Sequence, residues 1–64
     1  MTVDPWLTLS EAAEIARVSE STIRREIRGR RLRAARVGGR RSIRIRRSWI
    51  DEWLLASSQP VEER

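Results

Sequence analysis

Small apolar side chains recur at helical spacing near the start of the chain. They are Leu9, Ala12, Ala13 and Ala16. This spacing places them on one side of a helix, where the alanines let a neighbouring helix approach closely. Thr8, with Glu11 three residues later, matches the capping box that opens a helix. The pattern therefore predicts a first helix that begins directly after Thr8.

A second helix is predicted from Glu20 to Arg28, with Ser19 as its N-cap and Gly29 as its C-terminal stop. Ile23 and Ile27 define its buried side on a helical wheel. The opposite face and its flanks are polar: Ser21, Thr22, Arg24, Arg25 and Arg28. Two short helices joined by a tight turn result, and the second presents groups that bond phosphates and base edges.

From Leu32 the apolar period changes from helical spacing to a period of two. Residues 32–37 and 40–46 alternate on either side of Gly38-Gly39, which is a strong signal for a β-hairpin because both glycines can take positive φ. Ile43 and Ile45 are expected to face the core, with Arg44 and Arg46 facing water or a ligand.

A third helix is predicted from Trp49 to about Ser57. Ser48, with Asp51 three residues on, is the expected cap of this helix. Its apolar stripe is formed by Ile50, Trp53 and Leu54.

Together these elements predict a fold that is mainly α with a small β-hairpin. The order helix, turn, helix, two-stranded wing, C-terminal helix is that of a winged helix-turn-helix, here over residues 8–57. Residues 1–7 are expected to be an N-terminal arm and residues 58–64 a flexible polar tail. A domain this small needs its large apolar residues inside. The predicted core is Trp6, Leu9, Ile23, Ile27, Ile50 and Trp53.

Positive charge is concentrated in the middle of the chain. All 14 basic residues are arginines, and 12 of them lie between Arg24 and Arg47, where Glu26 is the only acid. Guanidinium groups bind phosphates and guanine edges in two-point geometry. This distribution favours a polyanion as the partner.

The composition also argues against other classes of protein. His, Cys and Lys are all absent, so the side chains usual in acid-base catalysis, nucleophilic catalysis and zinc binding are missing, and we expect no enzyme and no cofactor. No apolar run approaches the roughly 18 residues of a membrane-spanning helix. The N-terminus lacks a secretory signal pattern, so a cytoplasmic protein is expected.

The ordered set of motifs closely resembles the excisionase-type helix-turn-helix family, which is related to the DNA-binding domains of MerR-like regulators. The resemblance covers Leu7 to Leu54, about three quarters of the chain. The matching pieces are Leu7-Thr8 ahead of Glu11-Ala12-Ala13, Val18-Ser19 with Thr22-Ile23, Gly29-Arg30-Arg31-Leu32, Arg36-Val37-Gly38, and Arg47-Ser48 ahead of Trp53-Leu54.

The resemblance implies a sequence-specific binder of double-stranded DNA, with its second helix in the major groove and its wing against the backbone or minor groove. The implied helix contacts are Ser21, Thr22, Arg24, Arg25 and Arg28, and the implied wing contacts are Arg36, Arg40 and Arg41. Small members of this family are often excisionases, or recombination directionality factors, of phages and mobile elements. These bind repeated sites near an attachment site, bend the DNA and bias a partner integrase toward excision.

The chain departs from the family pattern at two positions, and two other functions are considered beside that of an excisionase. Arg33 stands where proline is frequent, and Trp49 where a polar or acidic residue is more usual. A small transcriptional repressor or activator is the first alternative, with dimerisation through Trp49 and Leu55. The second is an adaptor whose basic face binds an acidic protein or RNA.

Overall fold

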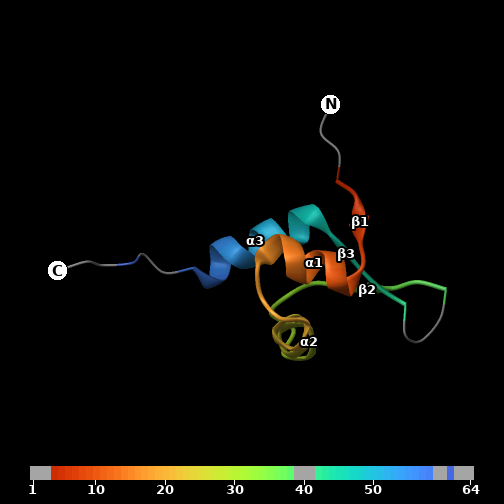
Figure 1. Ribbon diagram of the computed structural model, residues 1–64, viewed down its shortest axis with the longest axis horizontal. Coiled ribbons are helices and arrows are strands. Elements are labelled where there is room, and N and C mark those ends of the chain that lie inside the picture. Colours follow the sequence, from red (N-terminus) through yellow and green to blue (C-terminus); the bar gives the residue numbers. More distant parts are fainter. Residues whose placement is uncertain (1–3, 39–41, 59–60, 62–64) are drawn as a thin grey trace.

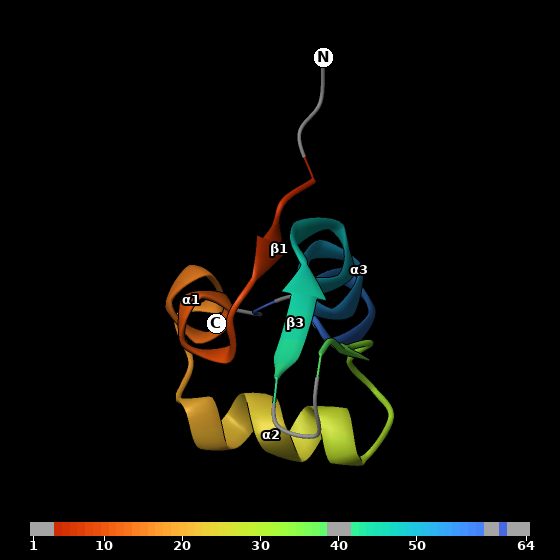
Figure 2. The same ribbon diagram turned by 90° about the vertical axis from the view of Figure 1, so that its right-hand side faces the viewer.

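The computed structural model describes residues 4–38, 42–58 and 61, and contains three helices and three strands in that part of the chain. In chain order the elements are β1 (Trp6–Leu7), α1 (Leu9–Ala16), α2 (Glu20–Arg28), β2 (Ala35–Arg36), β3 (Ile43–Arg46) and α3 (Arg47–Ser57). α1 and α3 flank β3, and α2 lies across one end of this assembly (Figures 1 and 2). The predicted winged helix-turn-helix fold is confirmed.

The helix starts that the sequence predicted for α1 and α2 are both present. The Thr8 backbone N–H donates to Glu11 Oε1 at 2.8 Å, and the Glu11 N–H donates to Thr8 Oγ1 at 3.1 Å. Ser19 Oγ accepts a hydrogen bond from the Thr22 N–H at 3.1 Å. These caps satisfy backbone donors that have no partner inside the helix, and so they fix where the two helices begin.

α2 ends as predicted at Gly29, but the residue with left-handed backbone is the next one. Gly29 has φ −81°, whereas Arg30 has φ +62°. The absence of a side chain at Gly29 serves a different purpose, because a Cβ there would lie 2.5 to 2.6 Å from the guanidinium of Arg31. The glycine therefore leaves room for Arg31 to fold back over the end of α2.

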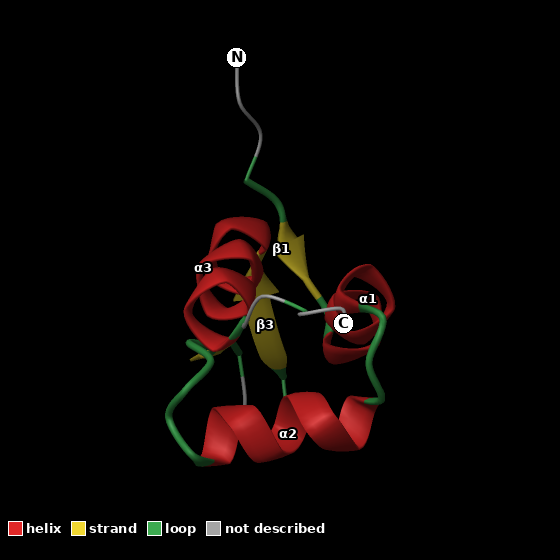
Figure 3. Cartoon of the chain, turned by 90° about the vertical axis from the view of Figure 1, so that its left-hand side faces the viewer, coloured by secondary structure: helices red, strands yellow, loops and turns green. Residues whose placement is uncertain are grey.

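The sheet has one more strand than the sequence predicted. β3 is central in the order β1-β3-β2, and both neighbours pair with it antiparallel. β1 is formed by Trp6–Leu7, which lie inside the segment expected to be an arm, and Leu7 pairs with Ile45. A two-residue strand is too short to show alternation in a sequence, and β1 is recognised by its position beside β3 (Figure 3).

The wing is closed by a hairpin with shorter strands than the alternation suggested. Gly38 has φ +64°, as the predicted turn requires, and the Val37 N–H donates to the Ser42 carbonyl at 2.8 Å. Arg36 pairs with Ile43 across the two strands. Gly39, Arg40 and Arg41 lie outside the described residues.

The core lies between the three helices and β3. Its buried members are Leu7, Ala12, Ala13, Ile23, Leu32, Ile45, Ile50 and Trp53. Leu9 and Ile27 are partly buried and pack against this cluster, as does Ile43.

The prediction that Trp6 belongs to the core is wrong, because its side chain is 47% exposed. Side chains alternate along a strand, so the burial of Leu7 turns its neighbour Trp6 outward. The Arg46 guanidinium lies 4.4 Å from the Trp6 ring centroid, and the ring of Trp49 meets Trp6 edge to face at 5.5 Å. Leu54 was also expected in the apolar stripe of α3, but it lies at the edge of that stripe and is 38% exposed.

The N-terminus of α3 is held by a residue distant in the sequence. α3 begins at Arg47, so Ser48 lies inside it and is not the cap that the sequence predicted. Asp4 supplies the acceptors instead: Oδ1 accepts from the Ser48 backbone N–H at 2.9 Å, and Oδ2 accepts from the Ser48 hydroxyl at 2.8 Å. Arg46 also donates to Asp4 Oδ2 at 3.2 Å, which corrects the expectation that Arg46 faces only water or a ligand.

This arrangement predicts how stability depends on pH. Hydrogen bonds from the backbone and then the hydroxyl of Ser48, with a further contribution from Arg46, lower the pKa of Asp4 below its usual 3.8. A carboxyl whose pKa is lower in the folded state stabilises the fold above its unfolded pKa, and this stabilisation is lost as the pH falls through the folded pKa. Asp4→Asn is therefore expected to lower the free energy of unfolding at neutral pH, measured by urea denaturation.

The same comparison at acidic pH provides the control. Once Asp4 is protonated it resembles the amide, so the difference between wild type and Asp4→Asn is expected to shrink as the pH falls below the usual aspartate range. An equal difference in unfolding free energy at neutral and acidic pH would show that the negative charge of Asp4 does not hold α3.

Candidate nucleic-acid interface

The polar face of α2 is exposed as predicted. Arg24, Arg25 and Arg28 are exposed together with Ser21, while Thr22 is half-buried. The hydroxyl of Thr22 lies 3.0 Å from that of Ser19, so part of its hydrogen-bonding capacity is used inside the cap. The helix is anchored from below by Ile23, which is fully buried. The burial of Ile23 therefore fixes the rotation of α2 about its axis, and this rotation turns the arginines toward the surface.

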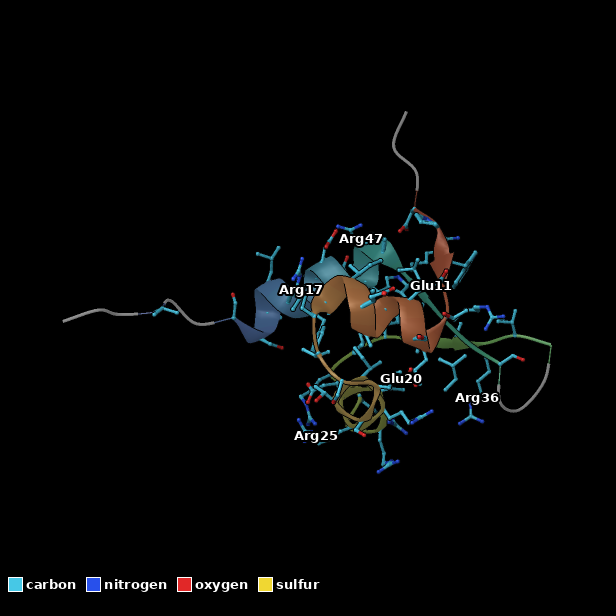
Figure 4. The ribbon with its side chains drawn as sticks, in the orientation of Figure 1. Glu11, Arg17, Glu20, Arg25, Arg36 and Arg47 are labelled. Atoms are coloured by element: carbon cyan, nitrogen blue, oxygen red, sulfur yellow. The ribbon has the colours of Figure 1, made fainter. Side chains whose placement is uncertain are left out.

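Three of the predicted arginines surround one hollow between α2 and the wing. This hollow has a volume of about 290 Å³. Its lining is Arg24, Ile27, Arg28, Arg36 and Ile43. The two isoleucines form its apolar floor. Arg36 comes from β2 and extends toward the side on which α2 lies (Figure 4). The fold thus brings guanidinium groups from two separate elements together around a single depression.

A second hollow of about 610 Å³ adjoins the first and shares Arg24, Arg36 and Ile43 with it. It reaches the start of α1 and the first two residues of β3. The additional residues are Thr8, Leu9, Ser10, Glu20 and Arg44. Ser10 was not among the predicted site residues, and Arg44 was expected only to face water or a ligand. Helical periodicity within one segment carries no signal for this juxtaposition, which is created by tertiary packing.

The ion pairs of the α2 arginines are loose. Arg24 lies 3.8 Å from Glu20, and Arg25 lies 3.9 Å from Glu26. Among the residues that the structure describes, Arg28 has no ion-pair partner. Exposed pairs at such distances contribute little in water. These arginines can therefore exchange their carboxylate partners for a polyanion at small cost.

Arg25 does not join the other three. It lines neither hollow, and Figure 4 shows it on the flank of α2 away from Glu20 and Arg36. The structure therefore groups Arg24, Arg28 and Arg36, and it sets Arg25 apart on the opposite flank of the same helix. Arg40 and Arg41, the other predicted wing contacts, lie outside the described residues.

Glu26 has a structural role that its position in the sequence did not predict. Its Oε1 accepts from Arg31 Nε at 2.9 Å and from the Trp53 indole at 3.1 Å. Its side chain is only 15% exposed. The hydrogen bond from Arg31, and after it the one from Trp53, lowers the pKa of Glu26. The hydrogen bond to Glu26 in turn raises the pKa of Arg31. Glu26 thereby ties α2 to α3 and to the segment that follows α2. The signal in the sequence that could have indicated this role is that Glu26 is the only acidic residue between Arg24 and Arg47.

The fold and this surface define the class of protein: a winged helix-turn-helix DNA-binding domain. The chain belongs to the helix-turn-helix domain family, whose profile matches residues 6–58. This is a DNA-binding family that includes excisionase-like proteins and is typically non-enzymatic. A search of curated proteins found no match for the chain. Within the described residues, no helix has the length and apolar character needed to cross a membrane.

Proposed function

We propose that this protein is a DNA-binding factor of the excisionase type, or recombination directionality factor, acting on the cytoplasmic DNA of its host. The observation that carries the DNA-binding part of the proposal is the hollow shared by Arg24 and Arg28 of α2 and Arg36 of the wing. A helix and a wing that flank one basic depression match the two contacts that a winged helix-turn-helix makes with a duplex.

In this proposal α2 enters the major groove and the wing contacts the backbone or minor groove. The helix contacts are Ser21, Thr22, Arg24, Arg25 and Arg28, and the wing contacts are Arg36, Arg40 and Arg41. An arginine that binds a guanine edge at two points distinguishes sequences, whereas one that binds phosphate adds affinity for any sequence. Of the three arginines of α2, Arg28 is the one without an ion-pair partner among the described residues, so we assign base recognition to it first.

The small size of the surface argues for cooperative binding. α2 has nine residues and the wing is a single hairpin. A module of this kind buries roughly 600–1,000 Å² on DNA, so one copy alone binds modestly. We propose that several copies bind a row of short sites near an attachment site, bend the DNA and bias a partner integrase toward excision.

A gel-shift titration on DNA from the protein's own genomic neighbourhood tests this function. The duplexes would include any attachment site, with random competitor DNA at physiological salt. The proposal predicts a ladder of cooperative complexes whose mobility indicates bending. Non-cooperative binding to one isolated site would contradict it.

A small transcriptional regulator is the second candidate. The observation that favours it is Leu55, which is 77% exposed on α3 and is thus available for a contact between two subunits. Trp49, the other residue expected at such a contact, is half-buried and packs against the core, so it contributes only part of its surface. This candidate predicts a single dimer-sized shift on promoter DNA in the same titration.

A further inference from the structure

A third hollow lies where the end of α2 meets α3. It has a volume of about 480 Å³, and among the described residues it shares only Ile27 with the hollows on the wing side. We call it the α2–α3 groove. Its apolar lining is Ile27, Leu32, Ala34, Trp49, Trp53 and Ala56, and its charged lining is Arg30, Arg31, Arg33 and Glu52. The proposed DNA contacts do not use these charged side chains.

The arginines of this groove are not equivalent. Arg31 is bonded to Glu26 at 2.9 Å, so its charge is largely compensated. Arg33 lies over the Trp49 ring, 5.5 Å from its centroid. Arg30 is exposed and has no ion-pair partner among the described residues. Arg30 and Arg33 are therefore the cations that a ligand in the groove would meet.

The chemistry of the groove favours a peptide over a phosphate backbone. Tryptophan and arginine are enriched at protein interfaces, where an apolar anchor is buried beside charged groups. The phosphates of a DNA backbone gain nothing from the apolar lining of the groove, whereas an apolar side chain of a peptide would be buried against it. A short segment with an apolar residue next to acidic residues is complementary to this surface.

The chain itself contains such a segment. Val61 is followed directly by Glu62 and Glu63. Val61 is 88% exposed, so it does not occupy the groove of its own chain. Ala56 lines the groove only five residues earlier, and a return within one chain would need a sharp reversal over that distance. A neighbouring copy requires no such reversal.

We infer that the α2–α3 groove binds residues 61–63 of a second copy of this protein, with Val61 on the apolar floor and the two glutamates against Arg30 and Arg33. This contact would link adjacent copies while leaving the wing side of α2 exposed. Its role on DNA rests on the cooperative binding proposed above. The contact itself does not involve DNA, so the two ideas can fail separately.

The test is a titration of the full-length ¹⁵N-labelled protein, without DNA, with a synthetic peptide of residues 57–64 (Ser-Ser-Gln-Pro-Val-Glu-Glu-Arg). The indole N–H signals of Trp49 and Trp53 report directly on the groove. They are expected to shift and saturate at peptide concentrations up to a few millimolar. A control peptide that carries Val61→Ser, Glu62→Gln and Glu63→Gln is expected to leave them in place.

A charge exchange makes the test specific. Arg33→Glu is expected to weaken binding of the natural peptide at least about tenfold, which is about 1.4 kcal/mol. A peptide with Glu62→Arg and Glu63→Arg is expected to restore binding to this variant. Arg47→Glu, on α3 but outside the groove, serves as the matched control and should bind the natural peptide normally.

Three results would overturn the inference. The first is an equal response to the natural and the control peptide. The second is an indole shift caused by a random-sequence duplex but not by the peptide, which would make the groove part of the DNA surface. The third concerns Val61→Ser in the intact chain. If this substitution shifts the indole signals by the same amount at every protein concentration, the segment lies in the groove of its own chain.

Discussion

Arg28→Ala is expected to weaken binding to the specific DNA site by about 5- to 150-fold, which corresponds to about 1–3 kcal/mol. Arg28 is exposed on α2, lines the hollow shared with the wing, and has no ion-pair partner among the described residues. Binding curves on the specific and a random duplex, measured by fluorescence anisotropy at several salt concentrations, give the effect.

The comparison between the two duplexes separates the roles of this arginine. If Arg28 contacts a base, the loss of affinity is larger on the specific duplex than on the random one, and the preference of the protein for the specific duplex becomes smaller. If it contacts phosphate, both affinities fall together and the salt dependence becomes less steep. Unchanged affinity on both duplexes would contradict any contact of Arg28 with DNA.

Ile45→Ala is expected to lower the free energy of unfolding by about 2–5 kcal/mol. Ile45 is fully buried on the central strand and pairs with Leu7. A domain of 64 residues has only about 3–10 kcal/mol of total stability at 0.05–0.15 kcal/mol per residue. Thermal or urea unfolding followed by circular dichroism should therefore show a variant that is partly unfolded at room temperature.

Leu55→Ala provides the matched control for this prediction. Leu55 is 77% exposed, so truncation removes little buried surface, and a change within about 0.5 kcal/mol is expected. A similar loss for Ile45→Ala and Leu55→Ala would show that the core is not organised around β3. A loss confined to Ile45 supports the central position of this strand.

Local signals in the sequence predicted the local structure well. The hydroxyl of Thr8 and the hydroxyl of Ser19 cap α1 and α2 as expected, because a cap involves residues only a few positions apart. The positive φ of Gly38 follows from the same kind of short-range chemistry. These features depend on residues that are close in the sequence, and so the sequence alone is enough to predict them.

The features that escaped prediction all depend on contacts between distant residues. Asp4 holds the N-terminus of α3 across 44 positions in the sequence, and β1 exists because β3 offers it an edge. Ser48 has the residue type of a cap, but the helix starts one residue before it, so its hydroxyl donates to Asp4 instead. No periodicity in a single segment reports such pairings.

The candidate site shows the same division. The helical wheel placed Arg24, Arg25 and Arg28 on the exposed side of α2, and all three are exposed. The wheel could not show which of them meets the wing, because this depends on where β2 and β3 lie. The position of α2 beside the wing brings Arg24 and Arg28 to the hollow that Arg36 also lines, and it leaves Arg25 on the other flank.

The side of α2 that faces the wing is expected to be the surface that binds DNA. The most direct test compares the triple variant Arg24→Ala, Arg28→Ala, Arg36→Ala with Arg47→Ala, which removes one exposed arginine from α3, where it pairs with Asp51. Both variants would first be shown to be folded by circular dichroism and then titrated onto duplex DNA at several salt concentrations. The triple variant is expected to lose nearly all affinity and to have a shallower salt slope, while Arg47→Ala is expected to bind almost as wild type. Equal affinity of the triple variant and the wild type would contradict this expectation.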